Sequence, residues 1–287
     1  MTIQRIVQMT PDFDSELGNS ADEDNATPLT VILRIAFRAA EPLGGTETRP
    51  TSCGIQTASR KVSIGSDWAE DLNGRVFRIV NWPSGALTTF AAQFRSQVEN
   101  LWNNRFFLKF PNPNDPAQAM NQADFDALQA PALIGRKTPF LRCLLRIDAV
   151  AEAERHHALM HVINLASGPS CKFQTFVAQR PGQADVGFLT NRDSTRTSAH
   201  ETGHMLGLQH VNDGAPACQS NHDADICYGE TPLQRRDLMG EGTAVHGAHA
   251  RRWLEAVALH TGHAAGWSAT HIEPPIEELL ESAVRRP

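Results

Sequence analysis

The sequence lacks a long uninterrupted run of apolar residues and any excess of basic charge. Its longest apolar segments are short and interrupted by arginine, as in LTVILRIAF, so none could cross a bilayer as a helix. The formal net charge is -6 at pH 7, whereas a surface that binds nucleic acid is normally basic. We therefore expect no membrane span and no nucleic-acid partner.

Cysteine is also scarce. Five cysteines in 287 residues do not make the dense disulfide framework of small secreted domains, so we expect most of them to be free thiols. Cys218 and Cys227 are the exception, because they lie close together in a segment rich in turn-forming residues. A disulfide between them would brace a loop and imply an oxidising destination, but the sequence does not decide whether it forms.

The first residues show no cationic region followed by an apolar stretch, which is the pattern of a Sec signal peptide. We therefore expect either a cytoplasmic protein or one exported by a route independent of a signal peptide, as an effector or toxin would be. Residues 1–27 are rich in Asp, Glu, Asn and Ser. This composition predicts a mobile acidic N-terminal tail.

Apolar periodicity predicts the secondary structure that follows. Alternating or β-branched apolar runs predict strands at residues 29–37, 75–81, 141–151, 157–165 and 185–190. Apolar residues at helical spacing predict two amphipathic helices, at residues 86–106 and 248–260.

A third helix is predicted after the strand at 185–190. Asn191, Asp193 and Ser194 are all residue types that cap helix N-termini, and the helix should run to about Leu206. This helix contains most of the string HETGHMLGLQH, which carries the clearest chemical pattern in the chain.

The first half of this string has the spacing of a metal site. Residues four apart are separated by about 40° around a helix axis, so His200 and His204 project from one face and can bind one metal ion. Glu201 lies about 100° from His200, where it can reach a metal-bound water but is badly placed to replace a ligand. We expect Glu201 to be a general base.

The second half supplies what two helical histidines cannot. A catalytic zinc ion typically has three protein ligands, so a third must come from outside the helix. Gly207 can adopt a positive φ and act as a hinge that ends the helix and turns the chain. His210, three residues later, can then reach the same metal ion.

The string HETGHMLGLQH is similar, at each defining position, to the HExxHxxGxxH signature of the metzincin clan of zinc metallopeptidases. The resemblance implies one catalytic Zn²⁺ ion bound by His200, His204 and His210, with Glu201 as the base. Metzincins also have a methionine-containing turn below the metal, the Met-turn. Met239 is the only methionine after the motif, and we assign it to that turn.

One position departs from a pattern seen in part of the clan. Some metzincins have a tyrosine two residues after the Met-turn methionine, but Glu241 stands there in this chain. We therefore expect no tyrosine ligand. Tyr228, the only tyrosine, is either an aromatic residue of a loop or a hydroxyl that supports the oxyanion.

The resemblance implies an α+β fold of the zincin or metzincin kind. It would comprise a twisted mixed β-sheet with an antiparallel edge strand, an active-site helix, and an irregular C-terminal subdomain that ends in a helix. Either residues 185–190 (DVGFLT) or residues 172–179 (KFQTFVAQ) would form the edge strand, which would bind substrate by β-addition.

The same resemblance predicts the domain organisation. A catalytic domain is expected at residues 71–270, with an upper subdomain to about residue 210 and a lower subdomain at 211–270. Residues 28–70 then form an N-terminal extension of unknown role, and residues 271–287 a tail or short helix.

The expected function is hydrolysis of peptide bonds in a protein or peptide substrate, by zinc-activated water with Glu201 as general base. Two alternatives stay open: a zinc hydrolase of a non-protein amide such as a peptidoglycan cross-link, and a catalytically silent zincin-like binding module. The sequence specifies neither the cleavage site nor the oligomeric state.

Two further features have hypotheses of their own. Residues 49–54, which include Cys53, resemble the cysteine-bearing pro-segment with which some matrix metallopeptidases block their zinc, since a thiolate is a good zinc ligand. The histidines outside the motif lack partners at ligand spacing, and we interpret them as surface or packed side chains. His246 is the one that could approach the site, because it follows the Met-turn.

Overall fold

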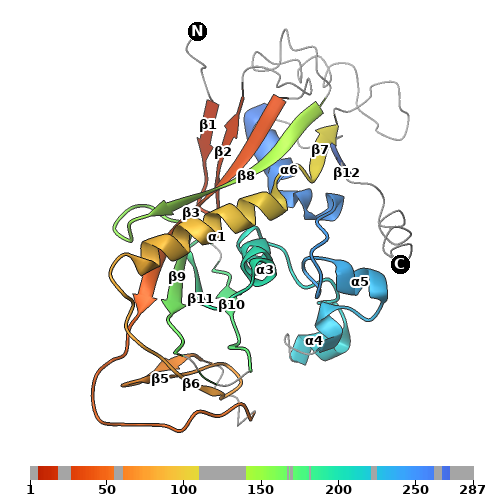
Figure 1. Cartoon of the computed structure of the whole chain (residues 1–287). Helices are drawn as coiled ribbons and strands as arrows, with labels where there is room; N and C mark the ends of the chain where they lie inside the picture. The colour runs from red at the N-terminus through yellow and green to blue at the C-terminus, as the bar shows by residue number, and fades with distance from the viewer. Residues whose placement is uncertain are drawn as a thin grey trace, which may run out of the picture. The chain divides into compact units, whose positions relative to one another are not determined.

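The computed structural model describes residues 6–18, 27–54, 61–109, 140–166, 168, 171–180, 182–220, 225–261 and 267–271. They form a mixed α/β structure with a twisted mixed sheet and a few helices (Figure 1). The chain divides into two compact units. The first unit consists of Leu33–Asn100 and Ile147–Gln209, and the second of Met1–Ile32, Leu101–Arg146 and His210–Pro287.

The helices of these residues are short or partly polar. Within the described ranges, no helix combines the length and the apolar character that crossing a bilayer requires.

The sheet of the first unit runs in the order β10-β11-β9-β3. The bounds of these strands are β3 Thr27–Ala40, β9 Ala158–Ile163, β10 Phe176–Ala178 and β11 Asp185–Thr190. Strands β3, β9 and β11 are parallel neighbours, whereas β10 is antiparallel to β11. The antiparallel strand therefore comes from KFQTFVAQ, and the strand DVGFLT is a parallel neighbour of β9.

Helix α1 (Ala86–Trp102) covers this sheet through one aromatic face (Figure 1). Phe94 and Val98 are buried, and the rings of Phe90 and Phe94 lie 6.0 and 5.3 Å from that of Phe37 on β3, both edge-on. Edge-to-face pairs of this kind add about 1 kcal/mol each beyond area burial. The helix predicted at residues 86–106 is confirmed, although it ends four residues earlier.

The first unit also contains a small antiparallel sheet, here called the small sheet. It consists of β4 Ser63–Ile64, β5 Trp68–Glu70 and β6 Val76–Arg78. Phe77 of β6 packs against Phe173, with ring centroids 5.3 Å apart, and both belong to a buried cluster with Ile163 of β9. Residues of the predicted extension at 28–70 thus supply most of strand β3, in the sheet β10-β11-β9-β3, and strands β4 and β5 of the small sheet.

A disulfide joins Cys53 to Cys171 in this unit. A sulfur already bonded to another sulfur cannot serve as a zinc ligand, so the hypothesis that Cys53 blocks the metal site is wrong for the oxidised protein. A second disulfide joins Cys218 to Cys227. Cys143, which is buried, is the single free cysteine, so the expectation of mostly free thiols is also wrong. Burial raises the pKa of the Cys143 thiol well above its ordinary value.

The second unit contains two sets of strands. In the first set, β1 and β2 form an antiparallel hairpin, and β2 also pairs antiparallel with the first half of β3. In the second set, β8, β7 and β12 are antiparallel neighbours in that order. The bounds are β1 Ile6–Met9, β2 Asp14–Leu17, β7 Phe106–Lys109, β8 Phe140–Val150 and β12 Ser268–His271.

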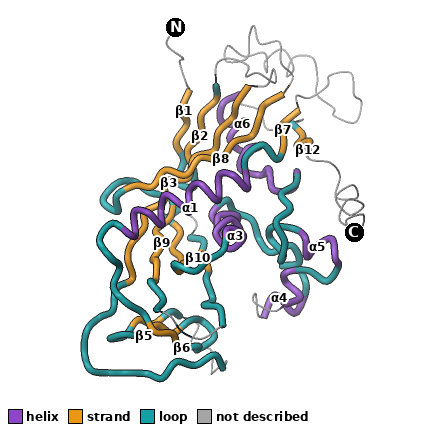
Figure 2. Tube along the Cα trace, in the orientation of Figure 1, coloured by secondary structure: helices purple, strands orange, loops and turns teal. Residues whose placement is uncertain are grey.

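The rest of the second unit is mainly irregular, as the long loop segments of Figure 2 show. Its short helices are α4 Pro216–Ser220, η2 Asp225–Tyr228, α5 Pro232–Arg236 and η3 Gly247–Ala250, followed by α6 Arg251–Thr261. Trp253 of α6 stacks on Trp102, packs edge-on against Phe106, and donates a hydrogen bond from Nε1 to the Leu144 carbonyl at 2.8 Å.

Two boundaries predicted from the sequence are corrected. Residues 6–17 are not a mobile tail, because they form hairpin β1–β2 and bury Phe13 and Leu17. The acidic residues around these two apolar side chains give the segment the composition of a tail. The C-terminal part does not end in a helix, because β12 follows α6 and pairs with β7, some 160 residues earlier in the chain. Residues 272–287 of the predicted tail lie outside the described residues.

Candidate metal centre

Helix α3 (Thr195–Met205), which carries the first two histidines, starts at a defined cap. Ser194 is the N-cap, and its Oγ accepts a hydrogen bond from the Thr197 backbone N–H at 3.2 Å. Such caps contribute about 1 kcal/mol to a helix. Of the three residues predicted as caps, Ser194 has that role.

The other two cap candidates fix the turn between β11 and α3. Asn191 Oδ1 accepts the Leu165 N–H, and Asn191 Nδ2 donates to Asn164 Oδ1 at 2.8 Å, which ties the end of β11 to the end of β9. Asp193 accepts hydrogen bonds from the N–H and the hydroxyl of Thr190, both at 2.8 Å. Burial raises the pKa of Asp193 to about 6, against the opposing effect of the Thr190 bonds.

The helix ends in a Schellman turn at Gly207. This glycine has a φ of 79°, its N–H donates to the His204 carbonyl at 2.8 Å, and the Leu208 N–H donates to the Gly203 carbonyl at 3.0 Å. These are the two hydrogen bonds of that motif, and the positive φ is one that a residue with a Cβ adopts only at a cost. The chain therefore reverses at the residue proposed as the hinge.

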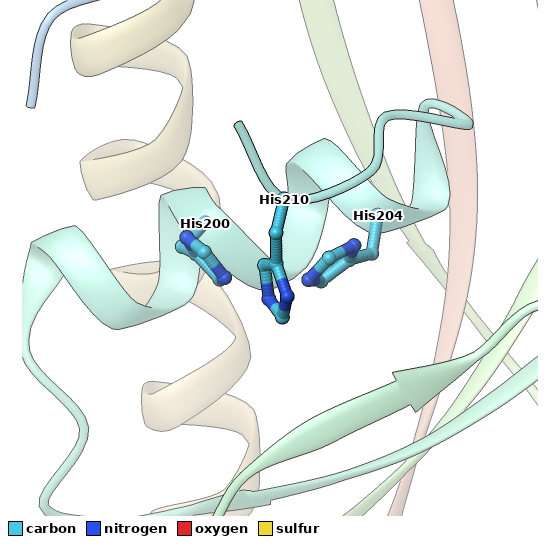
Figure 3. A group of neighbouring side chains, drawn as sticks. All are labelled: His200, His204 and His210. Atoms are coloured by element: carbon cyan, nitrogen blue, oxygen red, sulfur yellow. The ribbon is translucent and has the colours of Figure 1, made fainter. Parts of the chain in front are cut away.

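The three histidines of the motif converge after this turn. Figure 3 shows the rings of His200 and His204 on one face of the helix, with the ring of His210 between them. One ring nitrogen from each lies within 4.8 Å of the others. His200 is buried, whereas His204 and His210 are partly exposed. Three imidazoles that meet at one point form a donor set that zinc prefers.

The tautomer of His204 also suits a metal ligand. Its Nδ1 lies 3.0 Å from the Leu208 carbonyl, an oxygen that can only accept a hydrogen bond. Nδ1 therefore carries the proton, and Nε2 presents its lone pair, as in zinc sites where a carbonyl orients the ligand. The donor set and this tautomer fit a divalent metal ion such as zinc.

Glu201 is buried next to His200, and its orientation is set by a residue that sequence reasoning missed. The residue is 5% exposed, and Oε1 accepts a hydrogen bond from the Thr175 hydroxyl at 3.0 Å. Thr175 immediately precedes β10. No motif in the sequence indicates this contact, because the two residues come from different elements.

A second missed residue, Gln179, ties the segment after β10 to the end of α3. Its Nε2 donates to the carbonyl of His204 at 2.5 Å, and its Oε1 accepts from Gln209 Nε2 at 3.0 Å. These bonds hold the segment that follows β10 beside the helix end that carries His204.

Tyr228 lies against the third histidine. The ring centroids of His210 and Tyr228 are 4.2 Å apart, and the rings are tilted by 41°. Asn212 fixes the same region, because its backbone N–H donates to the Cys227 carbonyl and its Nδ2 to the Ile226 carbonyl. Tyr228 thus packs on a candidate ligand through its ring.

Met239 lies in a tight turn connected to the same segment. It is buried, its N–H donates to Asp237 Oδ1 at 2.7 Å, and its carbonyl accepts the Val211 N–H at 3.3 Å. Val211 directly follows His210. The assigned Met-turn is therefore hydrogen-bonded to the residue next to the third candidate ligand.

Asp237 anchors this turn to two histidines outside the motif. His246 Nε2 contacts Oδ2 of Asp237, and His249 Nε2 lies 3.0 Å from Oδ1. Burial alone would raise the pKa of Asp237, but the hydrogen bonds from His246 and His249 outweigh it, and the pKa lies well below its ordinary value.

The group Asp237, His246 and His249 also has three potential metal ligands within 4.8 Å. However, Nδ1 of His249 accepts the backbone N–H of His246 at 3.2 Å, so the proton of a neutral His249 is on Nε2 and faces the carboxylate. This pattern is that of a hydrogen-bonded brace. His246, which could have approached the metal site, binds Asp237.

Comparison with known proteins adds no relative. No family model matches the chain, and no curated protein and no solved structure matches it.

Proposed function

We propose that this chain is a zinc-dependent metallopeptidase of the metzincin kind. The observation that carries the proposal is the convergence of His200, His204 and His210 within 4.8 Å, beside the buried carboxyl group of Glu201. The Schellman turn at Gly207 explains how ligands from a helix and from the following loop reach one point. The buried Met239 corresponds to the Met-turn methionine of that clan.

The zincin-like fold is part of the same proposal. A sheet of parallel strands with the antiparallel strand β10, a covering helix α1, the motif helix α3 and an irregular segment after His210 are compatible with it. Strand β10 would bind an extended peptide by adding it as a further antiparallel strand. Gln179 would keep the end of β10 beside the motif helix.

The reaction follows from these side chains. Zinc held by the three imidazoles would act as a Lewis acid and lower the pKa of a water molecule toward about 7. Glu201 accepts a proton from the attacking water and later delivers it to the leaving amine nitrogen. The Leu208 carbonyl holds the proton of His204 on Nδ1, which would leave the Nε2 lone pair available to bind the ion. The ring of Tyr228 limits the rotation of His210.

The two disulfides bear on where such an enzyme would act. Disulfides persist in oxidising environments and are rare in a reducing cytosol. Cys53–Cys171 and Cys218–Cys227 therefore favour, of the two localisations left open by the sequence, export over the cytoplasm.

A digest of a peptide library, with metal analysis of the same sample, tests the proposal. We expect about one zinc ion per chain, cleavage that stops after chelation, and recovery on adding zinc back. Cleavage that survives complete metal removal would contradict the proposal. If the zinc-loaded protein cleaves no peptide but hydrolyses a peptidoglycan amide, its substrate is a non-protein amide instead of a peptide. If it hydrolyses neither, the chain is a binding module.

A further inference from the structure

We propose that Thr175 is a positioning residue for Glu201, and that the small sheet and the Cys53–Cys171 disulfide hold Thr175 in place. The inference rests on the proposed function, because it assigns a role within that reaction. It also gives a role to part of the segment, residues 28–70, for which the sequence suggested none.

The contact itself is specific in its direction. A carboxylate oxygen only accepts hydrogen bonds, so the 3.0 Å contact is donated by the Thr175 hydroxyl to Oε1 of Glu201. One fixed oxygen restricts rotation of the carboxylate about its terminal carbon–carbon bond. A general base has to lie within hydrogen-bonding reach of the proton it takes, so this restriction keeps the group in a productive orientation.

The residues before Thr175 are attached to the loop between β5 and β6. The Gln174 N–H donates to Asp71 Oδ2 at 3.0 Å, and Gln174 Oε1 accepts from Asn73 Nδ2 at 3.3 Å. One position earlier, the ring of Phe173 packs on Phe77 of β6. The backbone of Gln174 and the side chains of Phe173 and Gln174 are therefore held by the small sheet and its β5–β6 loop.

Asp71 is itself held firmly. It is fully buried, and Oδ1 accepts the backbone N–H groups of Asn73 and Arg75, each at 3.0 Å. The Arg75 guanidinium pairs with Oδ2 at 2.8 and 2.7 Å. A buried carboxylate with this many donors does not reorient without losing several charge-assisted hydrogen bonds. It is a fixed point for Gln174.

The disulfide adds a covalent attachment to the same segment. Cys171 lies four residues before Thr175 and is bonded to Cys53, 118 positions earlier in the chain. The segment from 171 to 175 is thus fixed at one end by a sulfur bridge, in the middle by Phe173 and Gln174, and at the other end by the bond from Thr175 to Glu201. The geometry is that of a support for the base.

Substitution of Thr175 tests the role directly, with kcat, KM, bound zinc and Tm measured for each variant. Thr175→Val keeps the shape but removes the donor, and we expect kcat to fall about tenfold or more at unchanged zinc content, with KM little altered. Thr175→Ser restores the donor and should restore most of kcat. A substrate-binding role would instead raise KM, and a purely structural role would lower Tm and not be rescued by serine; either result overturns the proposal.

A double-mutant cycle tests the support by the disulfide. Cys53→Ser with Cys171→Ser should lower kcat, and adding Thr175→Val to that pair should cost little more, because both changes release the same carboxylate. Independent, additive losses would overturn this part. Should the cysteine pair fail to fold, the Thr175 series decides alone. Inactive wild type refutes the proposed function, whereas active wild type with equally active Thr175→Val refutes only this inference.

Discussion

Nε2 of His249 lies 3.0 Å from Oδ1 of Asp237, the same oxygen that accepts the Met239 N–H. One buried carboxylate thus connects η3, which precedes α6, with the turn that contains Met239. Asp237 brings the two together because it is charged and stays charged: its pKa is lowered by the donors around it.

Asp237→Asn should therefore destabilise the protein, by about 2 to 4 kcal/mol at pH 7, since an amide NH₂ would face an imidazole N–H. A carboxyl whose pKa is lower in the folded state stabilises it above the unfolded pKa of 3.8 and loses that effect as pH falls further. Urea unfolding should show the difference between wild type and variant shrinking below about pH 3.8. A difference that does not change with pH there would contradict the brace.

The contribution of Asp193 to stability should depend on pH in the opposite direction to that of Asp237. Its pKa rises from 3.8 to about 6 on folding, so its contribution to stability is complete below pH 3.8 and is lost as pH rises to about 6. The free energy of unfolding of wild type relative to Asp193→Asn should fall by about 3 kcal/mol across that window and stay level above it. Urea titrations at several pH values measure this, and a flat difference would show that Asp193 is not desolvated.

Gly207→Ala tests the hinge. At a φ of 79° a Cβ costs about 1 to 2 kcal/mol, and relief of that strain would move His210 away from the other two ligands. Unfolding free energy and zinc affinity should both fall. Gly214→Ala is the matched control, because its added Cβ would meet nothing within 4 Å. Equal zinc affinity in both variants would mean that Gly207 is not needed to place His210.

Tyr228 has two roles left open by the sequence, and the ring contact with His210 favours one of them. If the ring only packs on the ligand, Tyr228→Phe should keep kcat within about twofold, while Tyr228→Ala should weaken zinc binding. Steady-state kinetics with zinc titration separates the cases. A loss of kcat of about a hundredfold in Tyr228→Phe, at full zinc occupancy, would instead assign the hydroxyl to the oxyanion.

A feature of the structure can be predicted from the sequence when the residues that determine it lie close together in the chain. Strand 185–190 and the helix that starts after Ser194 follow from periodicity and capping, which involve neighbours within a few residues. The turn at Gly207 and the spacing of the three histidines also depend only on residues that are close in the sequence.

The missed features have distant partners. The bond between Thr175 and Glu201 spans 26 residues, and the disulfide of Cys53 spans 118; no periodicity links such positions. The sequence does not indicate hairpin β1–β2, because its acidic composition predicts a mobile segment although Phe13 and Leu17 are buried.

The central claim is that Glu201 is the base of a metal-dependent peptide hydrolysis. Its most direct test is the turnover of a defined peptide by wild type and Glu201→Gln, both with measured zinc content. We predict equal zinc in the two proteins and a loss of kcat of at least a hundredfold in the variant, because glutamine cannot accept the proton. Comparable turnover by zinc-loaded Glu201→Gln would contradict the account.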